Sequence, residues 1–259
     1  MNEAHNAIGP AALFAVLRRA FLIQASWSFE RMQAYGFAYA MEPALRRLYR
    51  DRAEYEDRLR VHQEYFNTQP YLASFILGAA VRLEEDRATG RNPAADVSAL
   101  KAALMAPLGA LGDSFFWGAL KPMAAVAAVA VLMTGSWWAP ILFLALFNLW
   151  HLTLRAGMLF WGYASGGDAV ALMGRFPFTR TARRFKVISL SLLGGILGLM
   201  PLWRQEFRPA LPAPGPVLTL AGMAATLVLV ALLRRGGSPV KLMLGLAVLC
   251  LALAYAGVV

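Results

Sequence analysis

Long apolar runs alternate with short basic clusters over the second half of the chain. From 122 to 154, 33 residues pass without an Asp, Glu, Lys or Arg. One helix of that length would measure roughly 50 Å, whereas a bilayer core is crossed in about 30 Å. The run therefore has to break, and Thr134-Gly135-Ser136 with Pro140 behind it is the turn signal. We predict that 122–133, which is too short to span, belongs to a re-entrant hairpin and that 137–154 crosses the membrane.

The segment just upstream mixes apolar residues with helix breakers. Between 101 and 121 one proline and three glycines interrupt the pattern, and Asp113 is the only charged residue inside it. Broken helices at membrane depth are tolerated where they are buried in protein or line a cavity, and they mark transport sites in many carriers. We favour a re-entrant element here. The alternative is a surface loop between two domains, in which the aromatic run 115–117 would be exposed to water.

Three further apolar runs follow at 187–203, 209–233 and 242–259. The loop before the first carries five basic residues, the loop after it two, and the loop before the last three. Because basic loops stay on the cytoplasmic side, the five- and three-residue clusters are predicted to be cytoplasmic and the C-terminus to be outside.

The N-terminal region is amphipathic instead. Leu13, Leu17 and Phe21 recur at helical spacing with Arg18 and Arg19 between them, which predicts an arm lying at the membrane surface or against a partner. A second amphipathic helix is predicted over 44–66. Its apolar stripe consists of Leu45, Leu48, Tyr55, Leu59, His62 and Phe66. No signal peptide is expected, because polar residues interrupt the stretch after the paired arginines.

Composition agrees with a membrane protein. Hydrophobic residues make up 59% of the chain, against roughly 45–50% in soluble domains. Residues 122–259 hold 11 basic and 2 acidic residues, but the basic ones lie in short clusters between apolar runs, as in membrane loops rather than nucleic-acid-binding surfaces. Cys250 is the single cysteine, which leaves no disulfide or thiolate metal site. No phosphate-binding loop, dinucleotide motif or zinc motif occurs, so we expect no cofactor and no metal. The energy for any transport would then come from a partner or a gradient.

These patterns predict an all-α, polytopic membrane protein with amphipathic N-terminal helices, re-entrant hairpin elements and several transmembrane helices. Residues 1–66 form an N-terminal amphipathic arm and cytoplasmic-side helices. Residues 67–167 form a transport core with re-entrant segments and a crossing helix. A basic cytoplasmic loop (168–186) and three C-terminal transmembrane helices (187–259) complete the predicted organisation.

Several stretches, read together, resemble one family. They are Trp27-Ser28-Phe29-Glu30-Arg31-Met32-Gln33, Phe66-Asn67-Thr68-Gln69-Pro70-Tyr71, the segment 107–118 (PLGALGDSFFWG), Leu146-Phe147-Asn148-Leu149, Gly162-Tyr163 and the tail 232–259. In this order they resemble the IID membrane component of the mannose-family (mannose/fructose/sorbose) phosphoenolpyruvate-dependent sugar phosphotransferase system. The resemblance is nearly continuous from about 26 to 167 and returns in the last segment.

The resemblance implies a non-catalytic subunit of a hetero-oligomeric permease in the bacterial inner membrane, with a cytoplasmic N-terminus. In that family IID and IIC together carry a hexose inward, and IIA and IIB phosphocarrier proteins deliver phosphate to it. The chain departs from the family between 167 and 216, where a longer outward-facing portion is replaced by the short connection 205–216. This departure keeps open an alternative function as a membrane scaffold or regulatory subunit that moves no sugar. The sequence does not indicate which hexose is carried.

A hexose site needs amides and carboxylates for the sugar hydroxyls and an aromatic face for the ring. Six residues are of these kinds: Asp113, Asn67, Gln69, Glu30, Asn148 and Trp117. Each also has a structural interpretation, because a buried polar group without a partner costs about 1–3 kcal/mol.

The structural alternatives differ from one candidate to the next. Asp113 is suited to cap a half-helix beginning at Ser114. The amides of Asn67 and Gln69 are suited to a capping turn before the run 71–81. Glu30 is suited to an ion pair with its neighbour Arg31.

Asn148 is suited to bond a neighbouring helix, and Trp117 to pack in a core or an interfacial belt. The histidines raise the question of a phosphoryl carrier. His62, on an apolar stripe without an anion-binding loop, is not expected to be one.

Overall fold

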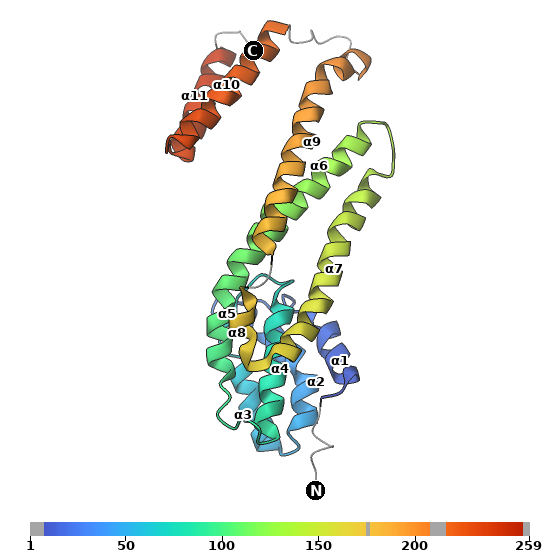
Figure 1. Cartoon of the computed structure of the whole chain (residues 1–259), viewed down its shortest axis with the longest axis vertical. Coiled ribbons are helices and arrows are strands. Elements are labelled where there is room, and N and C mark those ends of the chain that lie inside the picture. The colour runs from blue at the N-terminus through green and yellow to red at the C-terminus, as the bar shows by residue number, and fades with distance from the viewer. Residues whose placement is uncertain (1–7, 175–176, 208–215, 256–259) are drawn as a thin grey trace. The chain divides into compact units, whose positions relative to one another are not determined.

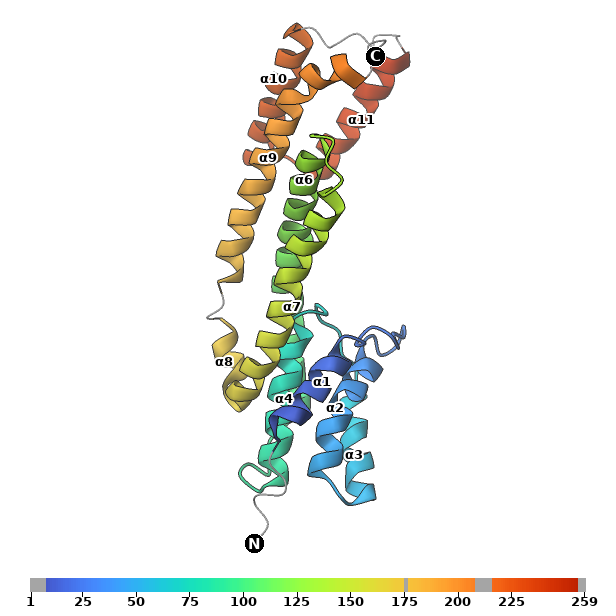
Figure 2. The ribbon, with the colours of Figure 1, turned by 90° about the vertical axis from the view of Figure 1, so that its right-hand side faces the viewer.

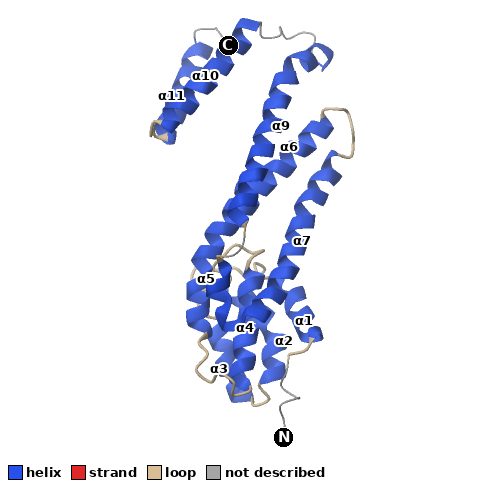
Figure 3. Cartoon of the chain, in the orientation of Figure 1, coloured by secondary structure: helices blue, strands red, loops and turns tan. Residues whose placement is uncertain are grey.

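A computed structural model describes residues 8–174, 177–207 and 216–255. Throughout these ranges the regular structure is helical (Figure 3), with only two isolated β-bridges, Ser28 to Met32 and Met32 to Phe66. The predicted all-α class is confirmed. The chain divides into two compact units, Met1–Gly194 and Gly195–Val259.

The first four helices form a bundle at one end of the first unit (Figures 1 and 2). They are α1 (Pro10–Ala20), α2 (Ala34–Leu48), α3 (Arg52–His62) and α4 (Ala73–Ala88). The predicted single helix 44–66 is wrong. The chain leaves helical geometry at Tyr49, and Asp51 starts a new helix by accepting a hydrogen bond from the backbone N–H of Glu54 at 2.9 Å. The predicted apolar stripe nevertheless faces the core, and His62 and Phe66 are fully buried.

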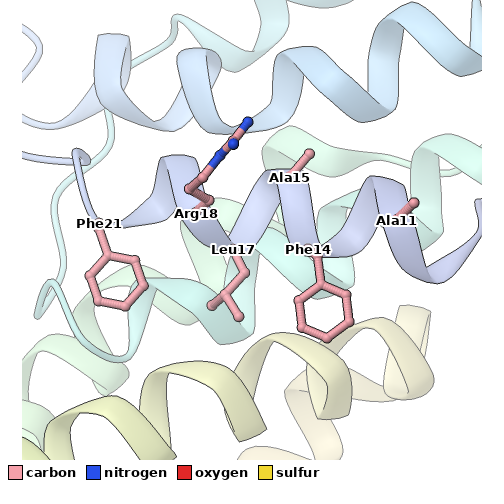
Figure 4. Close-up of a pocket in the computed structure, with 6 residues that line it drawn as sticks. All are labelled: Ala11, Phe14, Ala15, Leu17, Arg18 and Phe21. Atoms are coloured by element: carbon pink, nitrogen blue, oxygen red, sulfur yellow. The ribbon is translucent and has the colours of Figure 1, made fainter.

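Helix α1 is amphipathic as predicted and packs against α2, α4 and the later helix α7 (Ala139–Ser165). A cavity of about 480 Å³ lies along α1, and its lining is Ala11, Phe14, Ala15, Leu17, Arg18 and Phe21. Figure 4 shows Phe14, Leu17 and Phe21 on the side of the helix that faces α7, with Arg18 on the opposite side. Phe14 contacts Phe160 of α7 edge-on at 5.4 Å between ring centroids. The arm is therefore partly docked on the protein's own bundle.

A long helical hairpin follows the bundle. Helix α5 (Val97–Gly112), the π-helical segment η2 (Asp113–Leu120) and α6 (Lys121–Leu132) form one continuous helix of 36 residues, and α7 (Ala139–Ser165) returns beside it. Gly135 takes a positive φ of 75° in the predicted turn, which is confirmed. The predicted interruption of 101–121 is wrong, because Pro107 lies inside the helix and the glycines adopt helical geometry. The segment 122–133, predicted to be too short to span, forms the end of this longer helix, and its predicted re-entry stays a prediction.

The hairpin presents apolar side chains outward. Exposed residues around and beyond the turn are Val129, Leu132, Trp137, Trp138, Ile141, Leu144, Leu149 and Leu152. Among the described residues, two helices are long and apolar enough to cross a membrane, Val97–Leu132 and Ala139–Met173. Soluble proteins rarely expose contiguous apolar surface on this scale, so these faces fit a lipid environment.

Helix α4 crosses the hairpin helix α7 at two glycines. A Cβ added to Gly78 would lie 2.0 Å from the backbone oxygen of Leu159, and one added to Gly162 would lie 2.1 Å from that of Phe75. The contact is reciprocal, with each glycine lying against the other helix's backbone. Small residues permit such close helix approach, as they do in membrane proteins generally.

The remaining elements of the described ranges are also helical. They are η3 (Gly166–Asp168), α8 (Ala169–Met173), α9 (Phe178–Phe207), α10 (Pro216–Arg234) and α11 (Pro239–Tyr255). The described parts of the three C-terminal apolar runs are therefore helical, as predicted, while 209–215 and 256–259 lie outside the described residues. Their crossing of the membrane stays a prediction, as do the orientation of the termini and the division into four parts.

Candidate functional site

A cavity of about 580 Å³ lies where the first bundle meets the hairpin. Its walls come from the segment after α1, the start of α2, the loop before α4, and α5 with η2. The lining residues with polar or aromatic side chains are Gln24, Gln33, Tyr65, Asn67, Thr68, Asp113 and Trp117. Three of the six predicted candidates, Asn67, Asp113 and Trp117, thus meet in one place although up to 50 positions separate them.

Asp113 opens the π-helical segment. Its backbone is helical (φ −63°, ψ −43°) and the helix continues on both sides, so the predicted role as an N-cap is wrong. The side chain is exposed, and no hydrogen bond or ion pair from the described ranges engages its carboxylate. A π-helical turn is uncommon and frequently occurs at functional sites. Here it carries Asp113 and Trp117 to the same cavity.

Buried hydrogen bonds hold the loop that carries Asn67. Nε2 of Gln33 donates to the Thr68 carbonyl at 2.8 Å, and Oε1 of Gln33 accepts from the Thr68 backbone N–H at 3.2 Å. The Thr68 hydroxyl donates to the Met105 carbonyl of α5 at 2.9 Å. Both ends of the Gln33 amide are thus bound to the loop backbone, while the Asn67 side chain remains exposed at the cavity. Sequence reasoning missed Gln33.

Gln69 lies beneath this loop. Its Oε1 accepts hydrogen bonds from the backbone N–H groups of Tyr71 at 2.8 Å and Leu72 at 3.1 Å, which is the predicted capping role. The side chain is buried, and Nε2 has no partner within the described part of the chain. A Cβ on Gly112 would come within 2.5 Å of the Gln69 Cβ, so the glycine lets η2 approach the loop. Gln69 supports the cavity without lining it.

Two other candidates lie elsewhere. Glu30 is exposed between α1 and α2, and its predicted partner Arg31 bonds the Gln63 carbonyl instead, at 3.3 Å. Asn148 donates to the Leu144 carbonyl at 2.9 Å and lies 3.3 Å from Nδ1 of His151, so its partners are on its own helix rather than on a neighbouring one. Neither residue lines the cavity.

Trp117 forms an aromatic wall. Its side chain is 42% exposed, and its ring stacks near Phe147 at 6.3 Å and lies 5.8 Å from Tyr71. The ammonium group of Lys121 lies 5.1 Å from the Trp117 ring centre. These neighbours hold the indole in place while the residue stays partly exposed at the cavity, where an aromatic ring can contact the apolar face of a sugar.

A second polar cluster surrounds Glu84, away from the cavity. Its carboxylate accepts from Arg58 Nη2 at 2.7 Å, Tyr49 Oη at 2.7 Å and His62 Nε2 at 2.9 Å. Burial alone raises the pKa of Glu84, but the hydrogen bonds from His62 and Arg58 outweigh it and lower the pKa to about 2. The cluster ties α2 and α3 to α4.

The same cluster makes a carrier role for His62 implausible. Burial lowers the pKa of His62 against the opposing hydrogen bond and charge of Glu84, so the ring is neutral and donates through Nε2. The side chain is fully buried and stacks on Phe37 at 5.8 Å. A phosphoryl donor has no access to it.

Acidification is expected to destabilise the fold through this cluster. The lowered pKa of His62 means that below about pH 6.5 the unfolded chain binds a proton that the folded chain does not. Stability should therefore fall as the pH falls from 7.5 to 5.5, and again from 4.5 towards 2 as Glu84 is protonated. Melting temperatures of the purified protein test this. His62→Gln should flatten the first slope, and an unchanged slope in that variant would contradict the assignment.

Comparisons with known proteins show the family of this chain. Residues 8–200 match the family model described as the mannose/fructose/sorbose family IID component of the phosphotransferase system. The mannose-specific EIID component of Escherichia coli K12 is 40% identical over 184 residues, or 70% of this chain and 65% of that protein. The chain therefore matches less than two thirds of that relative's length. The sorbose-specific EIID component of Klebsiella pneumoniae is 32% identical, covering 70% and 67%.

Solved structures extend the likeness to nearly the whole chain. A structure titled as a membrane protein aligns with a TM-score of 0.70 at 32% identity, over 96% of this chain and 97% of that one. A chain from the complex of the mannose transporter ManYZ with microcin E492 aligns with a TM-score of 0.59 at 32% identity, over 97% and 98%. With the family model matching residues 8–200, this chain belongs to the mannose/fructose/sorbose family of phosphotransferase-system IID components, which are membrane proteins.

Proposed function

We propose that this chain is the permease subunit that, with a IIC partner, translocates a hexose across the bacterial inner membrane for phosphorylation by a IIB partner supplied by IIA. The observation that carries the proposal is the meeting of Asn67, Asp113 and Trp117 in one cavity at the base of an apolar hairpin. The N-terminus and the basic segment 175–186 face the cytoplasm in this scheme.

The cavity has the chemistry that a neutral sugar requires. A carboxylate at Asp113 accepts hydrogen bonds from hydroxyls, and the amides of Asn67 and Gln24 both donate and accept. Trp117 offers an aromatic face. The volume of about 580 Å³ falls within the range of roughly 300–1,000 Å³ that small-molecule sites occupy.

The proposed role is non-catalytic. Trapping of the sugar by phosphorylation depends on the partner proteins. Opposite walls of the cavity come from different elements, the loop at Asn67 and the hairpin helix at Asp113. A relative movement of these elements would change access to the sugar, as in alternating access.

Uptake by two cavity variants tests the proposal. Asp113→Asn and Asn67→Ala should each reduce hexose uptake about tenfold or more. The first replaces a carboxylate acceptor oxygen by an NH2 donor and the second removes the amide, and an unmatched buried hydrogen-bonding group costs about 1–3 kcal/mol. Glu30→Gln, which alters an exposed carboxylate outside the cavity, is the matched control and should transport normally. Normal uptake by both cavity variants, with normal membrane assembly, would refute the site.

The alternative function is a scaffold that moves no sugar, kept open by the short connection 205–216. Most of that connection, 208–215, lies outside the described residues. A complex with an intact cavity that binds no hexose would favour the scaffold over the permease.

A further inference from the structure

Arg155 is a buried cation inside the apolar helix α7. It is the only Asp, Glu, Lys or Arg between 122 and 167, and it is 3% exposed. Across the described ranges no carboxylate lies within ion-pair distance of it. An ionisable residue at such a position is costly and requires specific partners.

Its partners are two backbone carbonyls from different elements. Nη1 donates to the carbonyl of Ala20 at 3.4 Å, and Nη2 donates to that of Pro70 at 3.1 Å. Ala20 is the last residue of α1, where the helix end is partially negative. Its carbonyl also accepts a hydrogen bond from the backbone N–H of Ile23 at 3.2 Å. The rings of Phe21 and Tyr71 flank the guanidinium at 4.6 and 5.2 Å.

Both carbonyls belong to segments that line the candidate cavity. Pro70 itself lines it, three residues after Asn67, and Gln24 lines it four residues after Ala20. The cavity walls at Gln24 and Pro70 are 46 positions apart in sequence, and the side chain of Arg155 in α7 joins them.

We propose that Arg155 is a positioning residue of the sugar cavity, which fixes the separation between the segment carrying Gln24 and the loop carrying Asn67. The proposal rests on the function proposed above, but the geometry of the loop can be measured independently of transport. The planar guanidinium has two donor arms that point to two acceptors at once, whereas a lysine ammonium is a point charge on a flexible stem. Arg155→Lys should therefore retain the charge and lose one of the two hydrogen bonds to the carbonyls.

The rate of thiol labelling at the loop provides the test. In the full complex in membranes, with Cys250→Ser as background, Asn67→Cys reports access of a small maleimide to the loop. Arg155→Met should raise the labelling rate about tenfold, which is the effect of losing a hydrogen bond from a charged group. The labelling rate of Arg155→Lys should lie between that of Arg155→Met and that of the protein with Arg155 intact. Met158→Ala, which truncates a buried side chain of α7 that does not line the cavity, is the control and should leave the rate unchanged.

Sugar kinetics provide the second readout. With Asn67 intact, Arg155→Met should raise the KM for hexose uptake about tenfold and change the maximal rate little, because the walls that bind sugar are displaced. An unchanged labelling rate in Arg155→Met, or an equal rise in Met158→Ala, would overturn the positioning role. If Arg155→Met does not assemble, the labelling rates of Arg155→Lys and Met158→Ala are compared instead. Faster labelling in Arg155→Lys alone supports the positioning role, and unchanged or equal rates overturn it. Faster labelling with no change in any sugar parameter would refute the proposed function and leave the positioning role standing.

Discussion

Gly162→Ala is expected to destabilise the protein by about 3 kcal/mol or more, or to prevent its assembly. The added Cβ would lie 2.1 Å from the carbonyl oxygen of Phe75, 2.9 Å from its carbon and 3.1 Å from the nitrogen of Ala79. These are backbone atoms inside α4, so they cannot relieve the clash by a rotamer change as a side chain can. Helices α4 and α7 must separate, and the base of the hairpin is lost. Thermal unfolding of the purified protein, or its yield in membranes, measures the effect.

Gly157 offers a matched control on the same helix. A Cβ added there meets nothing within 4 Å. Gly157→Ala should therefore leave stability unchanged or raise it by up to about 1 kcal/mol, since alanine favours helix over glycine. Equal behaviour of the two variants would contradict the close crossing of α4 and α7.

Glu84→Ala is expected to cost about 3–5 kcal/mol, because it leaves the buried guanidinium of Arg58 without its counter-charge. Tyr49 and His62 would lose their acceptor as well. Since the cluster joins the α2–α3 pair to α4, this end of the bundle should open first. Thermal unfolding gives the loss, and hydrogen exchange of the α3 amides should locate it.

Glu56 is the natural comparison, as it also pairs with an arginine, Arg52, at 2.9 Å. That pair is on the surface, where such interactions contribute about 0–1 kcal/mol. Glu56→Gln should change little. A loss at Glu84 no larger than the loss at Glu56 would show that the buried cluster does not support the fold.

Periodicity and apolar runs were sufficient for the helical class, the C-terminal helices and the turn at Gly135. They failed where local chemistry competes with the pattern. The stripe over 44–66 continues in register across the break at Asp51, so only the capping signal of Asp51 with Glu54 three positions later marked a new helix. Conversely Pro107 was read as a breaker, although a helix can continue through a proline at a local cost.

The site shows a similar division. The motifs led to Asn67, Asp113 and Trp117, which line one cavity because these stretches lie on surfaces that meet; their role in sugar binding stays a prediction. Gln33 and Arg155 were missed because their partners are backbone carbonyls and amides, which no side-chain pattern reveals. Arg155 nevertheless left a signal, because it is a lone charge in a long apolar stretch and such a residue needs a buried partner.

Protection of a cavity cysteine by sugar tests the central claim most directly. Ala106 and Ala103 are both exposed on α5, but only Ala106 lines the cavity. In the assembled complex with Cys250→Ser as background, we predict that at least one of mannose, glucose, fructose or sorbose slows maleimide labelling of Ala106→Cys. The same sugar should leave the labelling rate of Ala103→Cys unaffected. If a sugar that the complex demonstrably transports slows neither reaction, the cavity is not part of the sugar pathway.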